Sequence, residues 1–155
     1  MPPRYGTRPL PVRAFVPGRT PRPATEPVAP AAPWDPADWP TLEPWLHAVD
    51  LFNHGFYWEC HEALEALWHA AGRSGPAAEL VHGLVQVAAG LLNLRRGHAA
   101  AAGRQVERGL ELGEAAAAAG VEMGFDPDEL ARAARAALAD PAAPPPILRL
   151  SHAGG

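Results

Sequence analysis

The chain has very little of three things: cysteine, lysine and long apolar runs. Its 155 residues include one cysteine, Cys60, which excludes an internal disulfide and fits a reducing compartment. All 13 basic residues are arginine, which we interpret as coding bias without chemical meaning. No apolar run reaches the length of a signal-peptide core or a membrane span. We therefore expect a cytoplasmic protein that does not enter a membrane.

Positive charge is also scarce beyond the first 33 residues. That segment carries five arginines and one glutamate, whereas the rest of the chain carries eight arginines and 16 acids. An acidic body argues against nucleic-acid binding, because phosphate contacts need clustered positive charge. The first segment could still contact RNA or an acidic surface through its five arginines, but these are dispersed and are weak evidence for it.

The composition divides the chain into two parts. Ten of its 19 prolines lie in residues 1–33, a segment without helical periodicity. Proline fixes φ and removes a backbone donor, so we expect an extended or disordered Pro/Arg-rich arm over residues 1–33. Its few apolar residues leave two roles open, docking onto the body and binding a protein partner. Residues 34–155 are expected to form one helical-bundle domain.

Apolar residues at three- and four-residue spacing predict an all-α fold, a single bundle of about five helices. Thr41 is expected to cap the first helix, and Gly55 and Gly97 each separate two helices, as in tetratricopeptide hairpins. The third helix is apolar almost all round, which fits a central core helix and equally a homo-oligomer interface. The expected helices cover residues 41–52, 56–71, 76–96, 98–119 and 126–140, and an extended tail at 147–150 lies over the bundle.

Two of these helices carry polar residues in apolar surroundings. At 100° per residue, His61 and Glu65 lie one turn apart at the edge of the apolar face of the second helix, with Glu62 beside them. The third helix carries one polar stripe, formed by His82, Gln86 and Asn93. An unpaired buried polar group costs roughly 1–3 kcal/mol, so we expect the two sets to pack together as a buried polar seam.

Three functions fit such a seam. The favoured interpretation is a hydrogen-bond network that fixes helix register in a structural or binding module. Alternatively, the seam is a metal or small-ligand site, in which His61 and Glu65 at i, i+4 ligate a divalent metal with His82 as the third ligand. In the third interpretation the protein is a metal-dependent hydrolase with Glu62 or His61 as the catalytic residue, because His61-Glu62-x-x-Glu65 resembles the zinc-protease helix.

A wider pattern resembles a known family. It consists of Leu-Phe-Asn-x-Gly-x-Tyr-x-Glu-x-His-Glu-x-Leu-Glu-x-x-Trp over residues 51–68 and His-Gly-Leu-Val-Gln-x-Ala-Ala over residues 82–89. In this order the two motifs resemble the family catalogued as domain of unknown function 309, over about residues 42–115. The resemblance implies a small all-helical bundle of bacterial, archaeal or plastid origin, and it brings no established activity. The family's defining positions correspond here to Tyr57, Glu59, His61, Glu62, Glu65, Trp68, His82 and Gln86, whereas the arm is not part of the pattern.

Overall fold

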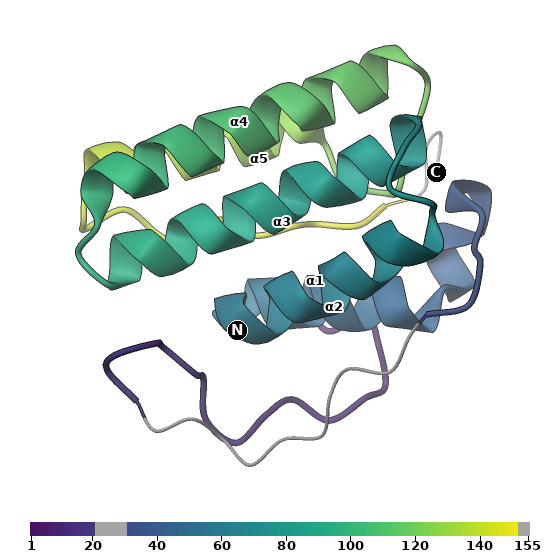
Figure 1. Cartoon of the computed structure of the whole chain (residues 1–155). Coiled ribbons are helices and arrows are strands. Elements are labelled where there is room, and N and C mark those ends of the chain that lie inside the picture. Colours follow the sequence, from purple (N-terminus) through teal and green to yellow (C-terminus); the bar gives the residue numbers. More distant parts are fainter. Residues whose placement is uncertain (21–30, 152–155) are drawn as a thin grey trace.

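The computed structural model describes residues 1–20 and 31–151, and these residues form an all-helical structure, as predicted. Residues 21–30 of the predicted arm and 152–155 of the predicted domain lie outside the described residues. No strand occurs in the described part of the chain. One 3-10 helix precedes the α-helices (Figure 1): η1 (Pro36–Thr41), α1 (Glu43–Asn53), α2 (Tyr57–Ala70), α3 (Pro76–Arg95), α4 (Ala99–Ala118) and α5 (Pro127–Ala139).

Helix boundaries follow the glycine and proline signals of the sequence. Asp126 caps α5 by accepting a hydrogen bond from Asp128 N at 2.9 Å, and Pro127 takes the first helical position. Gly55 and Gly97 have φ values of 82° and 83°, in the left-handed region that suits the residue after a helix. At these two turns the chain reverses, so α1 packs against α2, and α3 against α4.

The expected start of the first helix is wrong. Thr41 does not cap it, because residues Pro36–Thr41 form η1 and the Thr41 hydroxyl donates to the carbonyl oxygen of Asp38 at 3.3 Å. Asp35 caps η1 by accepting from Ala37 N at 2.9 Å. The helix α1 begins two residues later, at Glu43, where Pro44 suits the first turn.

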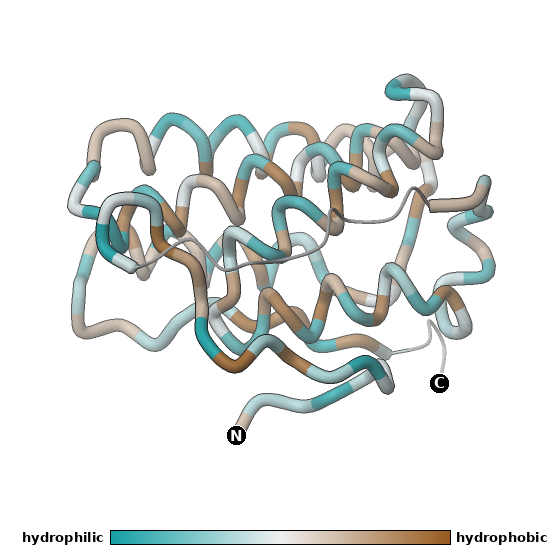
Figure 2. The backbone as a smooth tube through the Cα atoms, turned by 60° about the horizontal axis from the view of Figure 1, so that its bottom comes forward, coloured by the Kyte–Doolittle hydropathy of each residue, from teal (hydrophilic) through white to brown (hydrophobic). Residues whose placement is uncertain are grey.

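The central helix is α3, which lies between α2 and α4 in Figure 1. It approaches α4 so closely that a Cβ on Gly83 would lie 2.6 Å from the carbonyl oxygen of Gly109. Most large side chains of α3 are buried, and the hydrophobic stretches in Figure 2 lie mainly toward the middle of the bundle. By length and composition α3 is also apolar enough to cross a membrane, although polar residues interrupt its apolar sequence. A core helix passes the same test, and most of α3 is covered by the bundle.

The tail after α5 runs back along the bundle in extended form, as predicted (Figure 1). Leu148 is only 2% exposed. The buried amide of Asn53, in α1, donates to Leu148 O at 2.9 Å and accepts from Leu148 N at 2.7 Å. One side chain therefore satisfies both main-chain groups of a residue 95 positions away.

Candidate functional site

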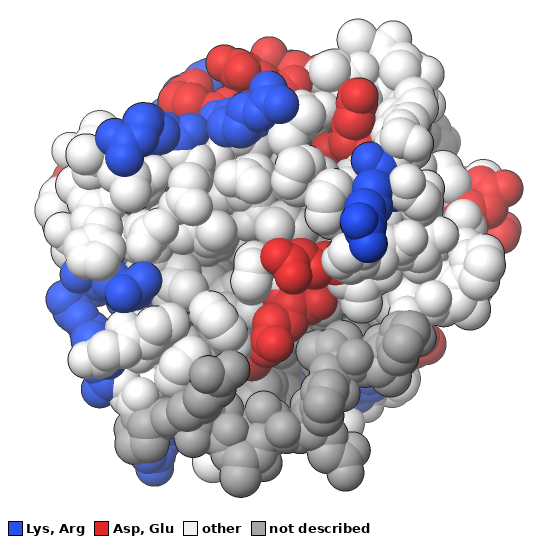
Figure 3. Space-filling model, in the orientation of Figure 1, with Lys and Arg blue, Asp and Glu red and all other residues white. Residues whose placement is uncertain are grey.

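The predicted seam residues of α2 pair along their own helix. His61 Nε2 lies 2.9 Å from Glu65 Oε1, and the two side chains are 23% and 44% exposed. The expectation of a buried seam is therefore wrong: both side chains lie at the edge of the bundle. An i, i+4 pair needs no partner from another helix, and only Nδ1 of His61 in this pair is buried without a hydrogen-bond partner. Figure 3 shows acidic atoms at the surface in the middle of this face, where α2 lies in Figure 1.

The seam residues of α3 behave in the same way. Gln86 Nε2 and His82 Nε2 are 3.3 Å apart, again at i, i+4. The link between the two helices is a ring contact, because the imidazole of His82 stacks on Trp68 with centroids 4.6 Å apart and planes at 18°. Trp68 also has the guanidinium of Arg73 at 6.0 Å from its ring centroid. Aromatic stacking thus links the polar pair of α3 to Trp68 of α2.

The other predicted site residues lie in different surroundings. Asn93 donates to the side-chain oxygen of Gln105, so its partner is on α4. Tyr57 is buried against Phe52, with ring centroids 5.7 Å apart, and burial raises the pKa of its hydroxyl. Glu59 faces the N-terminal arm. The structure does not bring these three residues to His61 and His82.

A divalent metal does not fit these residues. Among the described residues, no three His, Cys, Asp or Glu side chains form a group that could hold a metal ion. His61 Nε2 faces Glu65, whereas His82 Nε2 faces Gln86, whose amide is not among the usual ligands of zinc. The predicted ligand set His61, Glu65 and His82 therefore does not assemble.

A site that sequence reasoning missed lies at Asp50, on α1. Its side chain is completely buried. Oδ1 accepts a hydrogen bond from Tyr5 N at 2.7 Å, and Oδ2 accepts from Gly6 N at 2.9 Å and from Arg4 Nε at 3.0 Å. All three donors belong to the arm, 44 to 46 positions earlier in the chain. The available signal was an acid inside the apolar run of residues 48–52, because a buried charge needs a partner.

A second contact holds the arm on α2. Glu59 Oε2 accepts a hydrogen bond from Phe15 N at 3.0 Å. The Phe15 ring meets Trp58 edge to face, with centroids 5.1 Å apart and planes at 82°, and Phe15 and Val16 are both buried. Residues 1–20 of the arm therefore dock onto the body, one of the two roles that the sequence left open.

His47 lies beside the Asp50 contact and responds to the arm. Its pKa is below the usual value, first because the ring is half-buried and then because of the nearby charge of Arg8. Asp50 and Glu43 raise the pKa of His47, and Arg4 lowers it further. The two arginines of the arm thus favour a neutral imidazole at this place.

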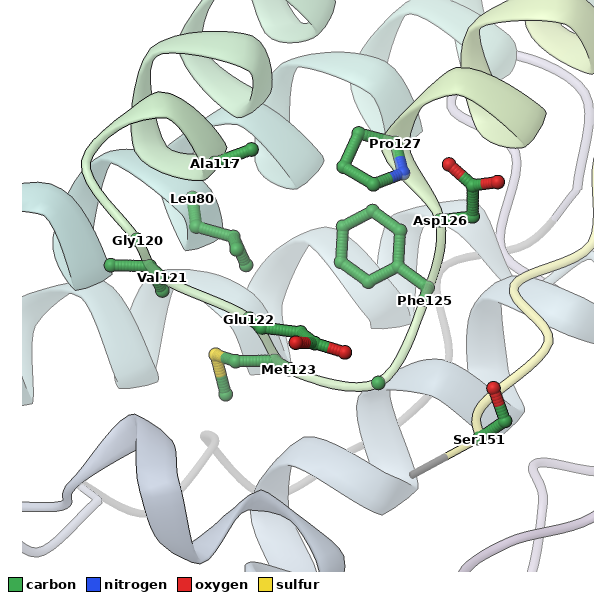
Figure 4. Close-up of a pocket in the computed structure, with 11 residues that line it drawn as sticks. Leu80, Ala117, Gly120, Val121, Glu122, Met123, Phe125, Asp126, Pro127 and Ser151 are labelled. Carbon is green, nitrogen blue, oxygen red and sulfur yellow. The ribbon is translucent and has the colours of Figure 1, made fainter. Parts of the chain in front are cut away.

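A separate pocket of about 420 Å³ opens at the α4–α5 loop. Figure 4 shows Leu80, Met123 and Phe125 around it, with the tail residue Ser151 at its edge. Ser151 N donates to Gly124 O at 2.8 Å, which fixes that edge. No predicted site residue lines this pocket, and Asp126, which does, already caps α5.

Fold and site together define a small helical-bundle protein with an extended arm held on acidic side chains. Residues 45–105 match the family model described as domain of unknown function, DUF309. The resemblance to this family is confirmed over that range, which is less than half of the chain. Comparisons with curated proteins and with solved structures gave no match.

Proposed function

We propose that this protein is a non-catalytic binding module whose α1–α2 surface holds an extended, arginine-bearing protein segment. In this chain the N-terminal arm is the segment that occupies the surface. The observation that carries the proposal is the carboxylate of Asp50, which is fully buried and takes its three hydrogen bonds from Arg4, Tyr5 and Gly6.

A buried carboxylate is unfavourable unless it is paired and hydrogen-bonded. Within the described residues, every hydrogen bond of the Asp50 carboxylate comes from the arm. With the arm in place, Asp50 is therefore satisfied by an extended segment that lies across α1. Two of the three donors are main-chain N–H groups, which any extended segment without proline at those positions can supply.

The charge of the two parts supports the same function. The first 33 residues carry five arginines and one glutamate, and the rest of the chain carries twice as many acids as arginines. Opposite charge steers an arginine-bearing segment toward the body. The carboxylates that hold the arm, Asp50 and Glu59, lie in the part of the chain that matches the family model, whereas the arm lies outside it.

The metal-dependent hydrolase is not our proposal. It requires His61, Glu65 and His82 to converge on one ion, and these side chains form two separate pairs. Glu62 would need a metal-bound water to act on as a base, and the same convergence would have to place that water.

The test uses the full chain with Gly6→Pro, because proline removes one N–H donor and its ring does not fit. A Cβ at Gly6 would already lie 3.1 Å from Asp50 Oδ2. A fluorescent peptide of residues 1–20 is titrated into this variant, with binding followed by anisotropy. We expect binding to the Gly6→Pro chain and much weaker binding to the wild type, whose own arm fills the site at an effective concentration on the order of millimolar.

The matched control is the Gly6→Pro chain that also carries Asp50→Asn. It should fold and lose the peptide. Equal affinity of the peptide for the variants with and without Asp50→Asn would contradict the proposal, as would an absence of binding to a Gly6→Pro chain whose circular dichroism is that of the wild type.

A further inference from the structure

We infer that His47 is a replacement counter-ion for Asp50: when its ring is protonated in mild acid, it takes the place of Arg4 beside the carboxylate, and the N-terminal arm is released. The inference rests on the proposed function, because it concerns the regulation of the same α1 surface. It involves only the arm that the structure shows on that surface.

The arm follows one stripe of α1. Glu43, His47 and Asp50 stand at i, i+4 and i+7, so they share one face of the helix. Thr7 Oγ1 donates to Glu43 Oε2 at 3.5 Å at one end of the stripe, and Asp50 holds the arm at the other end. Between these ends the backbone of the arm lies against the helix, because a Cβ on Gly6 would be 3.3 Å from His47 N. His47 therefore lies within the stretch of α1 that the arm covers.

The ring of His47 has a nitrogen without a partner. Nδ1 is buried, and it finds no hydrogen-bond partner among the described residues. A buried proton donor without an acceptor is unfavourable. Asp50 stands three positions further along the same helix, but both of its oxygens accept hydrogen bonds from the docked arm. While the arm is docked, a second proton on the His47 ring therefore gains no new acceptor from this carboxylate.

The charges around His47 change sign when the arm leaves. Burial of the ring lowers the pKa of His47 most, and Arg8 and Arg4 of the arm lower it further, whereas Asp50 and Glu43 of α1 raise it. Departure of the arm removes the two arginines and leaves the two carboxylates. The ring then binds a proton more tightly than it does beneath the arm. By linkage, protonation of His47 must favour the released arm to the same extent.

The released state needs a new partner for Asp50. Without the arm, the carboxylate loses the cation and the two N–H donors that it has in the structure, and a buried charge without a partner is strongly unfavourable. His47 stands at i, i+3 from Asp50, a spacing at which two side chains of a helix can pair. At neutral pH the imidazole is uncharged, and Arg4 remains the better partner. In mild acid the imidazolium can replace the guanidinium.

The first test is the NMR titration of the His47 ring in the wild type and in the full Gly6→Pro chain. Gly6→Pro breaks the contact of the arm with Asp50, so we expect the pKa of His47 to be higher in this variant than in the wild type. Asp50→Asn, added to Gly6→Pro, should remove most of that increase, because it removes the charge that the protonated ring binds. Equal pKa values of His47 in the wild type and in Gly6→Pro would overturn the inference.

The second test follows the arm in the full wild-type chain. The amides of Tyr5 and Gly6 donate to Asp50, so their protection from hydrogen exchange, corrected for the intrinsic rate at each pH, reports how tightly the arm is docked. From about pH 7.5 to about pH 5.5 we expect this protection to fall about fivefold or more, the lower end of the usual coupling between linked sites. His47→Gln should remove the fall, whereas His69→Gln, which changes an exposed histidine of α2, should keep it. The same fall in His47→Gln as in the wild type would refute the role of His47.

The outcomes keep the inference apart from the proposed function. If the peptide of residues 1–20 binds the Gly6→Pro chain as tightly in mild acid as at neutral pH, the inference is wrong and the binding module stands. An absence of peptide binding at every pH would contradict the proposed function. The titration of His47 would then still decide whether the chain's own arm is released by protonation of that ring.

Discussion

Asp50→Asn in the full chain is the substitution that tests the arm contact most directly. The change keeps the shape of the side chain and replaces one acceptor oxygen by an NH₂ group. Whichever oxygen remains, the Tyr5 N–H or the pair from Gly6 and Arg4 loses its acceptor. Hydrogen bonds to a charged group contribute about 1.5–3 kcal/mol each. The arm can also leave and regain water, which limits the cost, so we expect a loss of about 3 kcal/mol.

The assay is a double-mutant cycle in urea, with the wild type, Asp50→Asn, Gly6→Pro and the double variant. In the Gly6→Pro background the contact of residues 4–6 with Asp50 is already broken. Asp50→Asn should then cost almost nothing, because the carboxylate has already lost its donors from the arm. The coupling between the two changes should therefore be at least about 1.5 kcal/mol.

Asp38→Asn serves as the control for charge removal. Asp38 is exposed in η1, and its replacement should change the free energy of unfolding by less than about 0.5 kcal/mol. The reasoning is refuted if Asp50→Asn costs the same with and without Gly6→Pro. The carboxylate would then be satisfied by the bundle itself, and the arm would be incidental.

Three further predictions concern other parts of the molecule. His47 has a lowered pKa in the folded chain, so the unfolded chain binds more protons at mildly acidic pH. The free energy of unfolding should therefore fall as the pH drops below 6.5, the usual pKa of histidine. Urea titrations from pH 8 to 5 should show a smaller change of this free energy with pH for His47→Gln than for the wild type. Gly109→Ala should destabilise the fold by about 1–3 kcal/mol or more in urea titrations, because its Cβ would meet the Gly83 carbonyl and lie 2.8 Å from Val87 Cγ2. Gly103→Ala, with nothing within 4 Å of its Cβ, should stabilise the fold by about 0.5–1 kcal/mol in the same titrations. His61→Ala should cost less than about 1 kcal/mol, since its ion pair is partly exposed; a loss of several kcal/mol would mean that the pair is part of a buried network after all.

The helices could be predicted because their signals are local. Apolar spacing shows which segments are helical, and Gly55, Gly97 and Pro127 mark where they turn or begin. The start of α1 was misplaced because Pro-Thr followed by an acid suits the first turn of either an α-helix or a 3-10 helix. Only Asp35, which caps η1 from outside the expected helix, decides between them.

The seam shows the limit of a helical wheel. The wheel placed His61 and Glu65 correctly on one edge of α2, one turn apart. It could not show whether another helix covers that edge. His82 contacts α2 through the ring of Trp68. The sequence predicted hydrogen bonds between the two helices at this place, and aromatic stacking takes their place. The polar residues predicted a polar contact between α2 and α3, and the large indole ring of Trp68 forms an aromatic contact instead.

The Asp50 site was harder to foresee because its recognition is mainly through the main chain. An acid and an amide in one apolar stretch, Asp50 and Asn53, do signal that two partners must come from elsewhere. Every residue of an extended arm except proline offers the same N–H, so the sequence does not say which residues of the arm will bind. The register is set by space, because Gly6 alone lets the backbone touch α1, and by charge, because Arg4 then falls beside the same carboxylate. Main-chain bonds alone would fit many registers of the arm, and one glycine and one arginine select the register that is observed.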